Sequence, residues 1–396
     1  MPKLELTWPG ELPPVLLVGA GVVGQAIAEA HLERAVPFVL GDQSALAVRA
    51  AAERWSGQGI PVAGVSLPIQ GMSAVVVGNR ATETEAANQK QPIDPIPIVI
   101  ESIVEQVQAK RDLFVALQQA FGTAPVLCSN TSTLKIEQIA DAGLAAAGRV
   151  CGMHFFMPVH ARAAVEVVAT SRSDQDAIDR VVDHAGRIGK RPIRCQDGPG
   201  FIVNRMLSPY LNQALLLLCR GATESQIQRA ALAYGMPMSP LELIDWIGAP
   251  TMFHAGRAFV NAFPTRIDAS PVVPALVKRK RMGRAVGAGL YDYTDGVRSS
   301  ELAPESKELI EMYRTSRQAF TDGDVLRLLA IPMWIEAGSL LAEGVAESMN
   351  TVDQAMAGGL GFTAHSNWSE FFNELGQTQI DSAMNRWGQS FRSMNA

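Results

Sequence analysis

The chain has 396 residues, of which 47% are hydrophobic and 18% charged, and its formal net charge is −5. This length exceeds what one hydrophobic core can organise, so we expect two or three domains in an ordinary globular protein. The slightly acidic balance excludes a general attraction to nucleic acid or anionic membranes, so an anionic ligand would need a local basic patch or backbone dipoles.

The cysteines and the N-terminus indicate the compartment. The cysteines form no CxxC pair and no zinc-ligand spacing, which favours free thiols in a reducing cytoplasm and predicts no metal site; they are Cys128, Cys151, Cys195 and Cys219. Residues 1–12 lack the basic and apolar regions of a signal peptide, and we interpret them as an N-terminal extension. No apolar run approaches membrane-spanning length, so we expect no membrane span.

The first motif is a glycine-rich turn between a strand and a helix. Val15–Val18 is an apolar strand, a helix follows over Gln25–Arg34, and a second strand over Pro37–Leu40 leads to an aspartate. In this context the glycines allow a tight turn, close approach of the backbone to a pyrophosphate, and packing of helix on strand. The aspartate would accept from both ribose hydroxyls and repel a 2′-phosphate, which favours NAD over NADP. The predicted binding residues are Gly19, Gly21, Val22, Val23, Gly24 and Asp42.

The next part of the chain has clear secondary-structure patterns only in places. Ser44–Trp55 is a predicted helix, but residues 56–97 show one strand-like run, Ala74–Val77, and a polar, proline-spaced tail without an assignable role. Further on, we predict strands at Ile98–Ile103 and Pro125–Cys128 with a helix over Glu105–Ala120 between them.

A run of polar residues, Ser129–Thr133, follows the second of these strands. Open α/β sheets bind ligands just past the carboxyl ends of their strands, so the run is a candidate for ligand contact. The alternative is an N-cap for a helix beginning at Leu134, which would account for one hydroxyl but not for four polar side chains in a row.

A histidine and a glutamate lie in two further strands. Arg149–Phe156 contains His154, and Ala164–Ala169 contains Glu166. An imidazole with a carboxylate nearby can act as a general base and the group that orients it. The alternative is a core histidine beside an unrelated glutamate. A helix over residues 174–188 and an edge strand over residues 191–194 complete this domain, which a turn at residues 197–200 ends.

From Phe201 onward the pattern is helical. Predicted helices cover Phe201–Arg220, Glu224–Tyr234 and Ser239–Ile247. Eight identities at an offset of 123 residues, Pro209 with Pro332 among them, indicate a duplicated helical unit over residues 201–293 and 324–376. A polar linker separates the copies. A basic run, Lys278–Arg281 with Arg284, is either a solvated helix face or a lid that meets phosphates.

The motifs together resemble the L-3-hydroxyacyl-CoA dehydrogenase family from Val15 to about Gly376. The matching runs are GAGVVGQAIA, IESIVEQVQAKRDLF, SNTSTL, GMHFFMPVH with VEVV, DGPGFIVNRML, GMPMSPLELIDWIG and MGRAVGAGLYDY. The duplicated helical part is similar to the dehydrogenase half of bacterial fatty-acid oxidation alpha subunits, without their hydratase/isomerase domain.

The resemblance implies a fold and an order of domains. An α/β Rossmann-like NAD-binding domain would be followed by all-α C-terminal domains, a tandem helical repeat like that of 6-phosphogluconate dehydrogenase. The expected bounds are 1–12 for the extension, 13–198 for the NAD-binding domain, 199–294 for the first helical domain, 295–323 for the linker and 324–396 for the second helical domain.

The resemblance also implies NAD-dependent oxidation of a 3-hydroxyacyl-CoA to a 3-ketoacyl-CoA in fatty-acid beta-oxidation. His154 would be the base, oriented by Glu166, while Ser132 and Asn204 would donate to the substrate oxygen. The residues along the cofactor would be Glu105, Lys110 and Asn130. The implied partners are an acyl-CoA-type substrate and a thiolase or hydratase subunit, with the chain a monomer or homodimer.

Three departures from the family pattern bear on the substrate. Met157 replaces an asparagine, residues 56–97 lack the family's CoA-binding lysines, and Ala285 and Ala288 replace lysines in the glycine-rich loop. Two alternatives therefore stay open: a dehydrogenase of a non-CoA 3-hydroxy acid, and a non-catalytic subunit of an oxidation complex. The second has no physical need for His154 and Glu166.

Overall fold

The computed structural model describes residues 15–67, 69–78, 98–141, 143–266, 268–363, 365, 367–388 and 390–391. The predicted extension 1–12 and the proline-spaced tail of residues 83–97 lie outside these ranges. The chain divides into two compact units, the first ending at Phe201 and the second beginning at Ile202. Each unit is described by itself.

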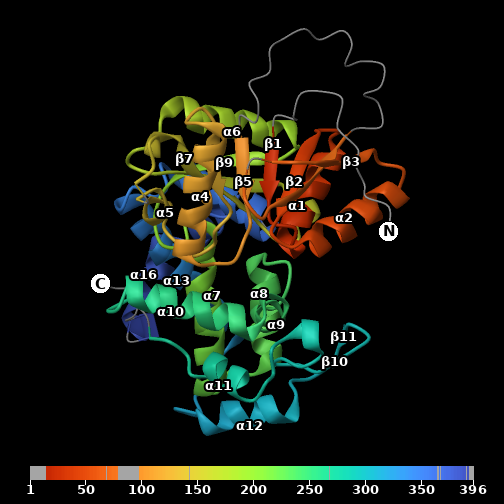
Figure 1. The fold of residues 1–396 in the computed structure, drawn as a ribbon. Helices are drawn as coiled ribbons and strands as arrows, with labels where there is room; N and C mark the ends of the chain where they lie inside the picture. Colours follow the sequence, from red (N-terminus) through yellow and green to blue (C-terminus); the bar gives the residue numbers. More distant parts are fainter. Residues whose placement is uncertain are drawn as a thin grey trace. The chain divides into compact units, whose positions relative to one another are not determined.

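The first unit is built on a sheet whose described strands run in the order β3-β4-β2-β1-β5-β6-β7-β8-β9. Figure 1 labels several of these strands and the helices beside them. The central pairs from β2 to β7 are parallel, whereas β3, β4 and the β7–β8 pair run antiparallel. The strands are β1 (Val15–Val18), β2 (Phe38–Asp42), β3 (Val62–Val65), β4 (Ser73–Val77), β5 (Ile98–Glu101), β6 (Val126–Ser129), β7 (Val150–Phe155), β8 (Ala164–Ala169) and β9 (Arg191–Gln196).

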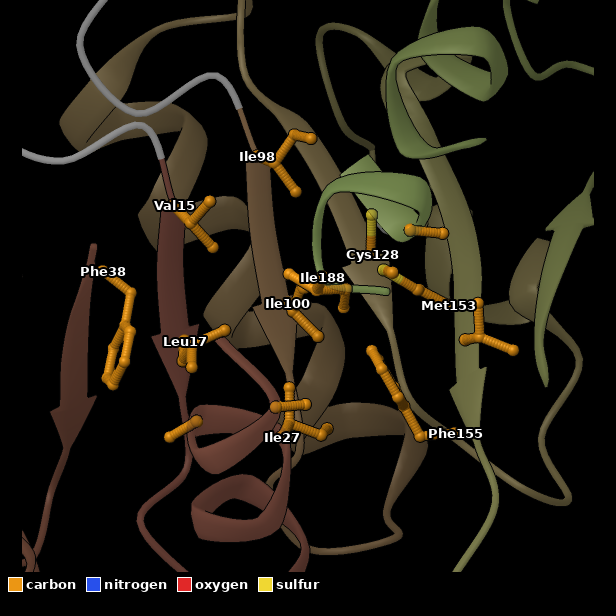
Figure 2. Close-up of a cluster of buried hydrophobic side chains, with 14 of the residues drawn as sticks. Val15, Leu17, Ile27, Phe38, Ile98, Ile100, Cys128, Met153, Phe155 and Ile188 are labelled. Carbon is orange, nitrogen blue, oxygen red and sulfur yellow. The ribbon is translucent and has the colours of Figure 1, made fainter. Parts of the chain in front are cut away.

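Helices connect the parallel strands and cover the sheet. They are α1 (Val22–Glu33), α2 (Ala45–Gly57), α4 (Val107–Phe121), α5 (Ile136–Ala140) and α6 (Gln175–Arg187), with short 3-10 turns η1 (Ala147–Arg149) and η2 (Val159–Ala161). Strands buried on both faces read as continuous apolar runs, and β1, β5 and β6 do so. Figure 2 shows the core that results, with Leu17 and Ile100 from the strands beside Ile27 from α1.

The predicted Rossmann-like organisation of this unit is confirmed, and most element bounds agree within two residues. Strand β3 was not predicted. Its four residues are all half-buried and include Ala63 and Gly64, so no apolar alternation marks it. Among the described strands, β3 pairs with β4 alone and forms one edge of the sheet. The other edge is β9, which the sequence predicted as an edge strand.

The second unit is helical apart from the short pair β10 (Tyr293–Thr294) and β11 (Val297–Arg298). Its helices are α7 (Val203–Arg220), α8 (Glu224–Tyr234), α9 (Pro240–Ile247), α10 (Ala249–Ala262), α11 (Val272–Lys278), α12 (Pro304–Met312), α13 (Asp322–Ala342), α14 (Met349–Ala355), α15 (Glu370–Leu375) and α16 (Gln377–Trp387), with a 3-10 turn η3 (Arg284–Val286) and a π-turn η4 (Met356–Leu360).

The repeat predicted from the sequence corresponds to two long helices that pack against each other, α7 and α13. Each contains an internal proline, Pro209 in α7 and Pro332 in α13. Each is followed by a glycine with positive φ, 115° at Gly221 and 71° at Gly344, because an L side chain is disfavoured in that conformation at a helix end.

Two features of this unit were not expected from the sequence. The linker predicted over residues 295–323 contains a helix that was not predicted, α12, which buries Leu309 and Ile310. Also, α13 is long and apolar enough to cross a membrane by length and composition, with a mean hydropathy of 1.5. Since 56% of its apolar window is buried and it packs on α7 and α8, we interpret α13 as a core helix.

Candidate functional site

The glycine-rich turn between β1 and α1 leaves no room for side chains at two of its three glycines. A Cβ at Gly19, where φ is +114°, would lie 2.6 Å from the carbonyl oxygen of Ser102, and one at Gly24 would lie 1.8 Å from that of Gly19. At Gly21 a Cβ would meet nothing within 4 Å. The turn therefore packs tightly against the sheet and is open at Gly21, where a pyrophosphate would approach the start of α1.

Asp42 ends β2 and is tied to this turn. One carboxylate oxygen accepts from the backbone N–H of Ala20 at 2.7 Å, and the other accepts from that of Ser44 at 2.7 Å. A carboxylate has about four acceptor sites, so two remain for ribose hydroxyls. The backbone thus fixes the carboxylate beside the glycine-rich turn, and its contact with the cofactor stays a prediction.

His154 and Glu166 are directly opposite each other in the antiparallel pair β7–β8. His154 Nδ1 lies 2.7 Å from Glu166 Oε2, and His154 Nε2 lies 3.2 Å from the hydroxyl oxygen of Ser132. Both members of the pair are buried, with exposed fractions of 3% for His154 and 0% for Glu166. With Glu166 accepting from Nδ1–H, the other ring nitrogen is left as an acceptor, the state that a general base requires.

Aromatic rings enclose the imidazole. The ring of Phe156 packs against that of His154 edge-on, with centroids 5.1 Å apart, and Phe201 packs at 5.6 Å. These contacts restrict the ring to one orientation and keep water from its sides.

Residues of the polar run after β6 donate hydrogen bonds to one carboxylate, that of Glu105. Glu105 Oε1 accepts from the Thr131 hydroxyl at 2.6 Å, from Ser132 N–H at 3.0 Å, and from both N–H and hydroxyl of Thr133 at 3.1 and 3.0 Å. Burial raises the pKa of Glu105, but the charge of Lys110 and these hydrogen bonds outweigh it and lower the pKa overall. Glu105 therefore holds the loop that presents Ser132 to His154.

Lys110 forms ion pairs with Glu101 and Glu105. Its ammonium lies 2.6 Å from Glu101 Oε1 and 3.4 Å from Glu105 Oε2, and its side chain is 1% exposed. Glu101 is fully buried and also accepts from the hydroxyl of Ser129 at 2.7 Å. Lys110 was predicted to lie along the cofactor; as placed, it acts on the site through Glu105.

Sequence reasoning missed Glu101. The available signal was a carboxylate at the end of the apolar strand β5, nine residues before the lysine on α4.

The remaining predicted residues are placed as follows. Asn130 accepts from the backbone N–H of Phe155 through its side-chain oxygen at 2.8 Å, which ties the end of β6 to β7 beside His154. Met157 is 46% exposed, three residues after His154. Asn204 lies in the first turn of α7, in the second unit, and its contact with a substrate stays a prediction.

Comparisons with known proteins agree on one family. The model described as 3-hydroxyacyl-CoA dehydrogenase, NAD binding domain, matches residues 14–198, and that described as 3-hydroxyacyl-CoA dehydrogenase, C-terminal domain, matches residues 200–293. A curated relative, a glyoxysomal fatty acid beta-oxidation multifunctional protein from Cucumis sativus, is 29% identical over 97% of this chain. The chain spans about half the length of that relative, 53%.

Solved structures share the fold. A 3-hydroxybutyryl-CoA dehydrogenase from Escherichia coli superposes with a TM-score of 0.72 at 24% identity, covering 96% of both chains. An (S)-3-hydroxybutyryl-CoA dehydrogenase from Ralstonia eutropha gives a TM-score of 0.58 at 26% identity, over 72% of this chain and 100% of its own. FadB2 of M. tuberculosis gives 0.58 at 27% identity with the same coverage.

Proposed function

Because the chain belongs to the 3-hydroxyacyl-CoA dehydrogenase family, we propose that it oxidises the C3 hydroxyl of a 3-hydroxyacyl thioester to a ketone. It is an oxidoreductase whose cofactor is NAD. NAD, when bound, accepts the hydride that leaves C3. The protein supplies the base, the position of the hydroxyl and the removal of water.

The observation that carries the proposal is the hydrogen-bonded chain of Ser132, His154 and Glu166. Loss of hydride from C3 requires loss of the hydroxyl proton, and an imidazole nitrogen can take that proton. His154 Nε2 would receive it, and the carboxylate of Glu166, 2.7 Å from Nδ1, would stabilise the imidazolium that forms. The Ser132 hydroxyl, which Glu105 positions, would bind the substrate oxygen as it becomes a carbonyl.

A second candidate is a dehydrogenase of a 3-hydroxy acid that carries no CoA. It is favoured by the state of the basic run at residues 278–284, because Arg281 in this run binds groups of the protein itself. Its guanidinium donates to the carbonyls of Gly289 at 2.6 Å and Tyr291 at 3.2 Å and pairs with Asp292 at 2.5 Å. It is therefore not a free cation for the CoA phosphates.

Binding and turnover assays separate the candidates. NADH fluorescence would first be titrated with protein, and acetoacetyl-CoA or acetoacetate would then be added to the complex. Oxidation of NADH with acetoacetyl-CoA but not with acetoacetate is the expected result. Turnover of acetoacetate alone would favour the second candidate, and binding of NADH without any turnover would leave only a non-catalytic role.

We also propose a cytoplasmic location and a thiolase or hydratase subunit as a partner. The four cysteines, all free and buried, support a reducing compartment. The beta-oxidation activity in the curated relative's name supports a place among enzymes that supply or consume 3-hydroxyacyl groups.

A further inference from the structure

Glu101 is a buried carboxylate of the first unit that the proposed reaction does not use. It ends β5, and its side chain is 0% exposed. One oxygen accepts from the backbone N–H of Ile103 at 2.6 Å and lies 2.6 Å from the ammonium of Lys110. The other oxygen accepts from the hydroxyl of Ser129 at 2.7 Å, and that hydroxyl accepts from the backbone N–H of Thr131 at 3.3 Å. Because a buried carboxylate is costly unless it is paired, this set of partners indicates a defined role.

Lys110 connects Glu101 to Glu105. Its ammonium is 1% exposed and contacts both carboxylates, at 2.6 Å from Glu101 and 3.4 Å from Glu105. The side chain of Glu105 is 40% exposed, and its other oxygen, Oε1, accepts the hydrogen bonds of residues 131–133. Two anions thus share one cation, and the buried anion makes the shorter contact.

This sharing determines where the carboxylate of Glu105 lies. If Glu101 lost its charge, Glu105 would be the one anion among the described residues within ion-pair distance of the buried ammonium. A buried cation that loses a partner is strongly destabilising, so the ammonium and Glu105 would move towards each other. That movement would draw Glu105 away from residues 131–133. The hydroxyl of Ser132, which lies 3.2 Å from His154 Nε2, would be displaced with them.

We propose that Glu101 is a positioning residue for the oxidation. By binding Lys110, it keeps Glu105 on the loop that presents Ser132 to the substrate oxygen and to His154. The inference rests on the proposed function for the role of Ser132, whereas every contact that carries it lies within the first unit.

The position of Ser132 can be measured without substrate, from the ring nitrogens of His154. In protein made with isotope-labelled histidine, the nuclear magnetic resonance signal of Nε2 depends on its hydrogen bond, and its loss in His154→Ala identifies it. Glu101→Gln should move this signal towards its position in Ser132→Ala. Glu101→Asp should remain folded, because Lys110 keeps a counter-charge, and it should move the signal less, because the charge is withdrawn by one carbon.

Kinetics separate positioning from a contribution to stability alone. Glu101→Gln should lower kcat and kcat/KM for the reduction of acetoacetyl-CoA alike, by about tenfold to a hundredfold, because a displacement of about 1 Å can cost this much. In a Ser132→Ala background the same substitution should cost less than about twofold, since the group that it displaces is already absent. A residue that only stabilises the fold would give additive losses.

Asp353→Asn is the matched control. Asp353 is 7% exposed and accepts from the backbone N–H and the hydroxyl of Ser369, at 2.7 Å and 2.9 Å, so this variant also replaces a buried, hydrogen-bonded carboxylate by an amide. It should lower the melting temperature but leave the His154 signal and kcat unchanged. An unchanged His154 signal in both Glu101 variants, or losses of kcat that add to those of Ser132→Ala, would overturn the inference. A wild-type protein without turnover of acetoacetyl-CoA would instead contradict the proposed function, because the His154 signal does not depend on turnover.

Discussion

The pairing of His154 with Glu166 predicts a distinctive set of mutant kinetics. Glu166→Gln keeps a hydrogen-bonding group against Nδ1 but cannot stabilise an imidazolium, so kcat should fall by roughly 10² to 10⁴-fold while NADH binding is retained. His154→Ala should be at least as severe. The double variant should be hardly worse than His154→Ala alone, because the two residues act as a unit. Steady-state kcat and NADH fluorescence titrations measure both quantities, and fully additive losses would make Glu166 a merely structural glutamate.

Asp42 predicts the choice of cofactor. The wild-type protein should bind NADH more tightly than NADPH, because a carboxylate repels a 2′-phosphate. Asp42→Ala should weaken NADH binding by roughly 1–3 kcal/mol, as for lost charge-assisted hydrogen bonds, and should narrow the difference between the two cofactors. Fluorescence titrations with each cofactor test this, and equal affinities in the wild type would show that the assignment of Asp42 is wrong.

Local motifs predicted only part of the site. The glycine turn, Asp42 and the His154–Glu166 pair are recognisable from sequence because each lies at a strand end or in facing strands. Glu101 was missed, and Lys110 was predicted along the cofactor rather than as the partner of Glu101. The two charged groups lie 2.6 Å apart and are 0% and 1% exposed. An ion pair between a strand end and the next helix depends on how α4 packs on β5, which residue spacing does not give.

Packing of α1 on α6 creates a titratable contact in the first unit. His31 Nε2 lies 3.0 Å from His184 Nε2, and His31 Nδ1 lies 2.8 Å from the carbonyl oxygen of Ile27. Burial lowers the pKa of His31 to about 4, an effect that the bond to Ile27 only partly offsets. Burial, with the charges of His31 and Arg187, lowers the pKa of His184 well below its usual value.

This pair predicts acid-sensitive stability. Unfolded histidine titrates near about 6.5, so between about pH 6.5 and about pH 4 the unfolded state binds more protons and stability falls as the pH falls. The limiting slope is about 1.4 kcal/mol per pH unit for each histidine. Urea unfolding at pH 7 and pH 5 should show the loss, and His31→Leu with His184→Leu should reduce it. His160→Gln, at an exposed histidine, is the control; an unchanged pH dependence in the double variant would contradict the prediction.

Helices and strands were predicted most accurately where their apolar residues form a clear pattern. Helices α8 and α9 and strands β1 and β8 were predicted within one residue. An amphipathic pattern marks the two helices, and a short apolar run marks each strand. Helix α12 was missed because only Leu309 and Ile310 mark its buried face among charged residues. Its N-terminal Pro304 is a start signal that the polar composition concealed.

The duplication of the helical part is a prediction that relates residues far apart in the chain. Identities 123 residues apart marked α7 and α13 as equivalents, and the two helices pack on each other. The buried charge of α13 could not be foreseen from the repeat, because equivalence predicts like residues, whereas α7 has Gln213 at the position equivalent to Glu336.

The distribution of charge over the chain predicts how weakly the CoA nucleotide is held. Net charge is −5, and two cations of the basic run are engaged: Arg281 by the carbonyls and carboxylate described above, and Arg279 by Glu308 at 3.2 Å. Arg284 is half-buried, lies over the ring of Trp246 and donates to the carbonyl of Gly296 at 3.3 Å. Lys278 and Lys280 are the exposed lysines of that run. Little attraction for phosphates is then expected, and that little should be screened by salt.

A pantetheine thioester, which lacks the nucleotide, should therefore react with a kcat/KM within about tenfold of that of the CoA ester. Raising the salt concentration should change the KM of the CoA ester only slightly, because few charge contacts are lost. Paired assays of 3-hydroxybutyryl-CoA and 3-hydroxybutyryl-pantetheine over a range of salt measure both effects. A hundredfold loss on truncation would show that the nucleotide is gripped. If the double variant Lys278→Ala, Lys280→Ala showed the same loss of kcat/KM with the intact CoA ester, the two lysines of the basic run would be the residues that bind the nucleotide.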